Sequence, residues 1–202
     1  RVLEYLNQVQ SRLPALFRKV FAAPNEPRTV VVVPGLSVDG EVLAKVVGGL
    51  HYEERQLAML MLLRLPNTRL VFVSSTPIES AIIDYYLGLL PGASREDARR
   101  RLVLFSADDA SPQTLTQKIL ERPRLLERIR IAIGDPDIAH LTVFNSTACE
   151  RTLAVRLGIP LYGCDPALLE IGGKSGSRQA FREAGIPLPD GAEDLRDTLD
   201  LT

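Results

Sequence analysis

Four short runs of β-branched and other apolar residues are spaced along the chain, and a stretch with helical periodicity follows each of them. The runs occupy residues 29–33, 70–73, 102–105 and 141–144. Runs that are apolar on both faces are typical of parallel strands covered by helices on both sides. The alternation therefore predicts an α/β fold, in which helices flank a mostly parallel sheet.

The segments between the runs carry helical signals. Apolar side chains recur at helical spacing through residues 1–21, and residues 53–65 predict another helix, which Asn67 stops. A proline-interrupted helical region covers residues 119–129. We expect these helices to cover the sheet.

Two four-residue segments have the sequence of a capping box. Thr76-Pro77-Ile78-Glu79 and Thr147-Ala148-Cys149-Glu150 each place a threonine three residues before a glutamate, so we expect each threonine to be the N-cap of a helix. Gly158 is positioned to end the second of these helices. Residues 160–163 then predict a short fifth strand.

Polar side chains gather where the predicted strands end. Right-handed crossovers bring the loops after parallel strands to one edge of the sheet, and open α/β sheets bind ligands at that carboxyl edge. Acidic residues in the first turn of a helix also complement its dipole, which is a structural explanation for Glu53 or Glu54. The candidate ligand-binding residues of this edge are Ser37, Glu53, Arg55, Ser75 and Asn145.

The first strand is not followed by a known catalytic or dinucleotide-binding motif. Residues 35–40 read G-x-S-x-x-G, with Ser37 where a dinucleotide fingerprint needs its second glycine. A hydrolase elbow would need glycine where Asp39 stands. The two histidines and two cysteines do not have zinc-ligand spacing. These patterns favour a strand-to-helix turn and predict no metal site.

Composition excludes several classes of partner. The chain has 202 residues and a net charge of −1, so no strong field favours nucleic acid or acidic lipids. Neither a signal-peptide core nor a run long enough to span a bilayer is present, and we expect a cytoplasmic protein. Cys149 and Cys164 do not suggest a disulfide framework, and we expect both side chains to be buried.

The last part of the sequence differs from the rest. Residues 171–177 form a glycine-rich segment that predicts a turn, followed by a helix from Arg178 to Ala184 that Gly185 closes. Lys174 lies in this turn. Free N–H groups and the helix dipole make a lysine at such a place suited to phosphate, although position 168 is leucine where a P-loop needs glycine.

Two sets of segments resemble known ligases. Gly172 to Arg178, followed by Phe181 and then Ala184-Gly185-Ile186-Pro187, resembles the start of the ATP-grasp domain of carboxylate–amine ligases. His51 to Arg55, Ser75 to Ile78 and Ile83 to Gly92 are similar to segments in the pre-ATP-grasp domain of peptide ligases of the pheganomycin type. The resemblance covers residues 29–196.

The resemblance implies a Rossmann-like pre-ATP-grasp domain at residues 1–167 and the beginning of an ATP-grasp domain at 168–202. It further implies that the parent protein uses ATP and Mg²⁺ to convert a carboxylate into an acyl phosphate, which an amine attacks to give an amide. Lys174 corresponds to the lysine that contacts an ATP phosphate. No other catalytic residue and no metal ligand is carried over, and a homodimer is a possible assembly.

The sequence leaves other functions open. The regions that hold adenine and Mg²⁺ in the family would lie beyond Thr202, so we expect residues 1–202 alone to lack ligase activity. One alternative is a stand-alone Rossmann-like binding or interaction domain without catalysis. Another is a small nucleotide-using or hydrolytic enzyme whose site contains Ser37.

Overall fold

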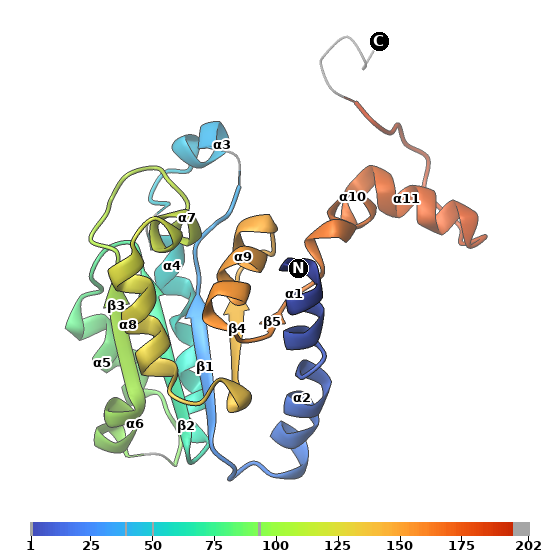
Figure 1. Ribbon diagram of the computed structural model, residues 1–202. Coiled ribbons are helices and arrows are strands. Elements are labelled where there is room, and N and C mark those ends of the chain that lie inside the picture. The colour runs from blue at the N-terminus through green and yellow to red at the C-terminus, as the bar shows by residue number, and fades with distance from the viewer. Residues whose placement is uncertain (1, 39, 50, 93, 196–202) are drawn as a thin grey trace. The chain divides into compact units, whose positions relative to one another are not determined.

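A five-stranded parallel sheet forms the centre of the computed structural model, which describes residues 2–38, 40–49, 51–92 and 94–195 (Figure 1). The spatial order of the strands is β3-β2-β1-β4-β5. This order, with all pairs parallel, is that of a Rossmann-like doubly wound sheet. The strands are β1 (Arg28–Val33), β2 (Thr68–Ser74), β3 (Leu102–Ser106), β4 (Ala139–Val143) and β5 (Leu161–Tyr162).

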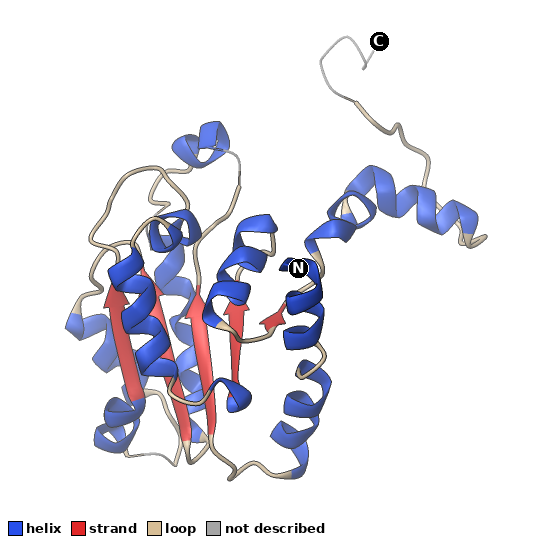
Figure 2. Cartoon of the chain, in the orientation of Figure 1, coloured by secondary structure: helices blue, strands red, loops and turns tan. Residues whose placement is uncertain are grey.

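Helices cover both faces of this sheet (Figure 2). Val31 of β1 packs in a core cluster with residues of α7, α8 and α9, whereas Val30, which points to the opposite face, packs with residues of η1, α5 and α6. The predicted α/β architecture is therefore confirmed. The helices of this part are α1 (Val2–Gln10), α2 (Leu13–Ala22), α3 (Gly40–Lys45), α4 (His51–Arg55), the 3₁₀ helix η1 (Gln56–Arg64), α5 (Ser80–Gly88), α6 (Arg95–Arg101), α7 (Leu115–Leu120), α8 (Pro123–Ile133), the 3₁₀ helix η2 (Pro136–Ile138) and α9 (Ala148–Leu157).

The helix predicted over residues 53–65 has a different form. It consists of α4 followed by the nine-residue 3₁₀ helix η1. In a 3₁₀ helix, side chains three residues apart are aligned. Leu57, Leu60 and Leu63 have this spacing and are all fully buried, so the tighter helix points all three into the core.

Prolines divide two other helical regions. The stripe predicted over residues 1–21 forms α1 and α2, and Pro14 lies in the first turn of α2, where its missing N–H costs no helical hydrogen bond. The expected interruption near residue 123 is also present, because Pro123 begins α8 after α7 has ended.

One of the two predicted capping boxes forms. Thr147 caps α9, the Glu150 side chain returns to the Thr147 backbone, and Gly158 ends the helix in the left-handed conformation. The prediction at Thr76 is wrong, because α5 begins at Ser80 after the N-cap Glu79. Ser75 is held by a carboxylate from α4, and the chain remains non-helical until Glu79.

A side chain covers the outer side of β5. The Gln10 Nε2 donates to the Leu161 carbonyl oxygen (2.6 Å), and the Leu161 N–H donates to Gln10 Oε1 (2.9 Å). The amide thus makes the pair of hydrogen bonds that a neighbouring strand would make.

The chain divides into two compact units, Arg1–Gly163 and Cys164–Thr202. The second contains η3 (Pro166–Leu168), α10 (Leu169–Gly172) and α11 (Lys174–Glu183). The helix predicted from Arg178 begins earlier, at Lys174, with Gly173 as its N-cap. The prediction of a glycine-rich turn over residues 171–177 is therefore wrong, because Gly173 alone separates α10 from α11.

Glycines of this second unit fit their positions sterically. A Cβ on Gly176 would lie 2.0 Å from the Glu170 carbonyl oxygen, so only glycine allows α10 and α11 to pack this closely. Gly185 has a positive φ of 68°, and the Ile186 N–H bonds the Phe181 carbonyl oxygen (2.9 Å). This is a Schellman motif, and it confirms that Gly185 closes the helix.

Two further expectations concern cysteines and membranes. Cys149 and Cys164 are both exposed, so the expectation of buried thiols is wrong; Cys149 lies in the first turn of α9, whose buried face carries Glu150 and Leu153 instead. Among the described helices, none has the length and apolar character that crossing a bilayer requires.

Candidate functional site

A buried polar network lies at the carboxyl end of β2. Glu53 Oε2 accepts a hydrogen bond from the Ser75 N–H (2.6 Å), and Oε1 accepts one from the Ser75 hydroxyl (2.7 Å). The Lys118 Nζ donates to Ser75 Oγ (3.1 Å) and to the Asp109 carbonyl oxygen (2.8 Å). Three elements, α4, the end of β2 and α7, thus meet through one serine.

Burial changes the acid–base properties of this network. Glu53 is 6% exposed and Lys118 is fully buried. Desolvation raises the pKa of the Glu53 carboxyl, although the Ser75 hydrogen bonds and the Lys118 charge oppose it. Desolvation likewise lowers the pKa of the Lys118 amine, against the attraction of Asp109 and Glu53. Each group favours the charged form of the other.

An ion pair borders the network. Arg122 Nη2 contacts Asp109 Oδ2 at 2.6 Å. Hydrogen bonds from Ser111, with help from Arg122, lower the pKa of Asp109 to about 2, so this carboxylate is charged under all ordinary conditions. The pair fixes the loop whose Asp109 carbonyl accepts from Lys118.

The network forms part of the wall of a cavity of about 200 Å³. Glu53, Ser75 and Lys118 line one side, and Ser111, Gln113 and Thr114 contribute further polar groups from the loop before α7. Lys118 uses two of its three donors on described residues, so one remains for a ligand. Both hydrogen-bonding roles of the Ser75 hydroxyl are taken, which suits binding better than nucleophilic attack.

A second cluster joins the ends of β1 and β4. The Ser37 N–H donates to Asn145 Oδ1 (2.9 Å), and Asn145 Nδ2 returns a bond to the Ser37 carbonyl oxygen (2.7 Å). The Ser37 hydroxyl donates to Glu150 Oε1. Glu150 is buried and also caps α9, so this cluster fixes the loop after β1 against the start of α9.

The glycine that begins the loop after β1 has a packing function. A Cβ on Gly35 would lie 2.5 Å from the Leu115 Cβ of α7. Glycine at position 35 therefore lets the loop after β1 lie close to α7. This agrees with the interpretation of the G-x-S-x-x-G segment as a structural turn.

The structure separates the candidate residues of the edge. Glu53 and Ser75 contact each other, as do Ser37 and Asn145, but the exposed Arg55 joins neither cluster. Its guanidinium lies over the Tyr52 ring, 4.3 Å from the centroid. That Arg55 binds a ligand therefore stays a prediction from the sequence.

Sequence reasoning missed the lysine of this edge. Lys118 precedes Ile119 in a helical stretch and has the sequence context of an ordinary surface residue. The pairing of a fully buried lysine with Glu53 depends on how α7 packs at the end of β2, which no local pattern encodes. Glu150 was predicted as a cap, but its bond to Ser37 was not.

Lys174 belongs to the second unit and lies at the first position of α11, where it is exposed. A cation beside the free N–H groups of a helix start fits a phosphate. Mg²⁺ does not fit the part of the chain that the structure describes, because no three His, Cys, Asp or Glu side chains there are close enough to hold a metal ion. Lys174 therefore stays a prediction as a phosphate contact, and the described residues contain no cluster that could hold a metal ion.

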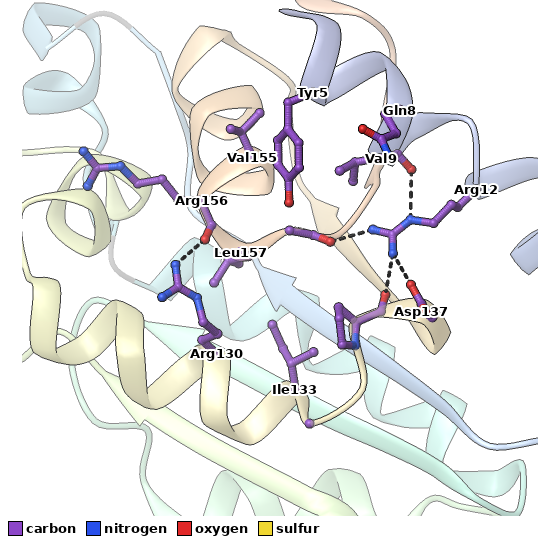
Figure 3. A pocket seen from close by; sticks show the side chains of 13 residues that line it. Tyr5, Gln8, Val9, Arg12, Arg130, Ile133, Asp137, Val155, Arg156 and Leu157 are labelled. Atoms are coloured by element: carbon purple, nitrogen blue, oxygen red, sulfur yellow. Dashed lines mark hydrogen bonds and ion pairs between the residues drawn. The ribbon is translucent and has the colours of Figure 1, made fainter. Parts of the chain in front are cut away.

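A larger hollow of about 650 Å³ opens among α1, α8 and α9 (Figure 3). Arg12 donates to the Gly158 carbonyl oxygen (2.5 Å) and contacts Asp137 Oδ1 (2.5 Å), and Arg130 donates to the Arg156 carbonyl oxygen (2.5 Å). The guanidinium of Arg156 extends away from the hollow (Figure 3). Since these cations bind the chain's own oxygens, the hollow is best explained by the attachment of α1.

Comparison with known proteins supports a relation between this chain and the ATP-grasp ligases, without distinguishing the pheganomycin type. The chain is 30% identical over 146 residues to L-propargylglycine–L-glutamate ligase of Streptantibioticus cattleyicolor, a match that covers 70% of this chain and 30% of that protein. It is also 25% identical over 209 residues to IQ motif-containing protein H of Danio rerio, which covers 96% of this chain and 20% of that protein.

The chain thus spans less than a third of the length of either relative. No family model matches the sequence. No solved structure matches it either.

Proposed function

We propose that this chain belongs to an ATP-dependent carboxylate–amine ligase of the pheganomycin peptide-ligase type, which forms an amide through an acyl phosphate. In this proposal residues 1–167 are the pre-ATP-grasp domain and residues 168–202 begin the ATP-grasp domain. The observation that carries it is the similarity to L-propargylglycine–L-glutamate ligase over 70% of the chain. The Rossmann-like strand order agrees with the fold that the resemblance implies.

The residues of the chain would have limited and distinct roles. Lys174, at the start of α11, would bind a phosphate oxygen of ATP. ATP, when bound, supplies the phosphoryl group that activates the carboxylate. The cavity bordered by Glu53 and Lys118 presents one acidic and one basic group, and would bind a small polar part of a substrate. Mg²⁺ has no described ligands here, so we assign it no step.

Lys174 provides the direct test. In the natural gene product that contains this chain, Lys174→Ala should raise the KM for ATP by about tenfold or more, because a charge-assisted hydrogen bond to phosphate is lost. Lys174→Arg should retain most of the affinity. The assay measures phosphate release that depends on both an amino-acid carboxylate and an amine, over a panel of amino acids.

A matched control is Lys45→Ala, which removes an exposed lysine of α3 in the other unit and should leave the KM unchanged. If the gene product releases no phosphate with any acid and amine of the panel, and binds no ATP in calorimetry, the ligase proposal is wrong. A binding domain without catalysis would then be the better interpretation.

A further inference from the structure

A second cavity, also of about 200 Å³, lies between α2 and the sheet, on the face to which Val30 points. It is independent of the carboxyl-edge network and of the proposed ligase activity. Helix α2, the 3₁₀ helix η1 and strands β1, β4 and β5 all contribute to its wall. The apolar residues of the wall include Leu13, Leu16, Phe17, Met59, Leu62 and Ile138.

Aromatic rings form one side of this cavity. The Phe17 and Tyr162 rings are stacked with centroids 6.0 Å apart, and the His140 ring meets Tyr162 edge-on at 6.2 Å. Phe17 and Tyr162 are each about half exposed, so the cavity has an edge close to solvent. Such a wall offers flat apolar contact to a ligand.

A buried cation that forms no ion pair with a carboxylate of the described residues lines the same cavity. Arg28 is 9% exposed, and its Nη2 donates to the carbonyl oxygens of Ala23 and Pro24 (3.0 Å each). Its Nη1 is buried and has no hydrogen-bond partner in the described part of the protein. The neighbouring Glu26 carboxylate pairs with Lys19 instead (3.6 Å). A buried charge is costly unless it is paired.

Two polar groups of β4 accompany Arg28 in the wall. The Thr142 Oγ1 is buried and lacks a partner among the described residues. Burial and the Arg28 charge lower the pKa of His140 to about 4, so its ring is neutral at neutral pH. Buried charges are nearly always paired, so the Arg28 guanidinium in this wall favours an anionic occupant.

We propose that this cavity binds a small organic monoanion with an apolar body, such as an aryl or branched-chain carboxylate. Its anionic group would pair with the Arg28 guanidinium. Its body would lie among Leu13, Leu16 and Met59. The volume is below the roughly 300–1,000 Å³ of sites for drug-sized molecules, so the ligand is small. Metal ions and cationic ligands are excluded, because Arg28 would repel them.

The test uses the purified 202-residue chain and 3-phenylpropanoate, with 3-phenylpropan-1-ol as the neutral analogue of the same shape. Isothermal titration calorimetry should show saturable binding of the acid, and at least about tenfold weaker binding of the alcohol, because the alcohol cannot pair with the guanidinium. The acid should also raise the melting temperature. Equal affinity for acid and alcohol, or no binding of the acid at millimolar concentration, would overturn the proposal.

Variants locate the site. Leu16→Trp should fill the cavity and abolish binding of the acid, whereas Leu89→Trp, at the exposed residue that follows α5, should not change it. Arg28→Met should weaken binding about tenfold or more, and Arg100→Met, at an exposed arginine of α6, should leave it unchanged. Since Arg28 also binds backbone oxygens, Leu16→Trp keeps the test decisive where Arg28→Met fails to fold. If Leu16→Trp binds 3-phenylpropanoate as tightly as the wild type does, the acid does not bind in this cavity and the proposal is wrong.

Discussion

At the scale of single residues, Ser75 determines how the carboxyl edge is organised. Its N–H and hydroxyl hold Glu53, and its oxygen accepts from Lys118, so two buried charges of opposite sign share one small side chain. Burial of both charges is tolerated because each is hydrogen-bonded and each lies in the field of the other. The resulting cavity wall is polar although it lies in a mostly apolar fold.

The raised pKa of Glu53 should be visible in stability measured against pH. For a carboxyl whose folded pKa is raised, the stabilising contribution is present below the unfolded value of about 4.5 and is lost as pH rises through the folded value. Glu53→Gln lacks this contribution. The free energy of unfolding of the variant, minus that of the wild type, should therefore increase as pH rises from 4.5. Urea denaturation between pH 4 and 8 measures this difference.

Lys118→Met provides a coupled variant. The Lys118 charge lowers the Glu53 pKa, so its removal should shift the same pH window upward. A difference between Glu53→Gln and wild type that is constant across pH would contradict the raised pKa. A window that Lys118→Met leaves in place would contradict the coupling.

At the scale of elements, glycine positions determine how helices approach one another. Gly176 lies within α11, where glycine is normally unfavourable, because the α10 backbone leaves no room for a Cβ. Gly172 ends α10, and a Cβ there would meet nothing within 4 Å. Within the glycine-rich segment, Gly176 is thus required for close helix packing, whereas Gly172 is not.

This difference predicts opposite effects of alanine. Gly176→Ala should disrupt the contact of α10 with α11 at a cost of about 1–3 kcal/mol, more than the gain in helix propensity of about 1 kcal/mol. Gly172→Ala should be neutral or slightly stabilising. Amide hydrogen exchange of residues 169–183 measures the local stability. Equal protection in the two variants would show that the steric restriction at Gly176 is not real.

The sequence predicted the elements well where local chemistry decides them. All five strands and the Thr147 cap follow from β-branched runs and a capping box. The 3₁₀ form of η1 was missed because leucines three residues apart fit an amphipathic α-helix almost as well. The Thr76 prediction failed because a distant carboxylate holds Ser75, and Lys118 was missed because its burial depends on tertiary packing.

At the scale of the whole molecule, the chain consists of a large α/β unit and a small helical one. The core clusters on both faces of the sheet are made entirely by residues before Gly163. The larger unit therefore has a hydrophobic core made of its own residues. The candidate phosphate contact, Lys174, is carried by the smaller unit.

This organisation predicts that residues 1–163 fold alone. Their melting temperature should lie within about 2–4 °C of that of residues 1–202, a shift equivalent to about 1 kcal/mol or less for a domain of this size. Differential scanning calorimetry of both chains measures it. A fragment of residues 1–163 that is unfolded or molten would contradict the division into units.

The Gln10 amide at β5 has a consequence for assembly. An exposed strand edge is a template on which another chain can add a strand, and such addition underlies both edge-to-edge dimers and aggregation. Here the Gln10 side chain already occupies the N–H and carbonyl groups of Leu161, and no further strand can pair with a side-chain amide. A second copy of the protein would have to displace Gln10 before it could continue the sheet from β5. If this protein forms a homodimer, we therefore expect its two sheets to meet somewhere else.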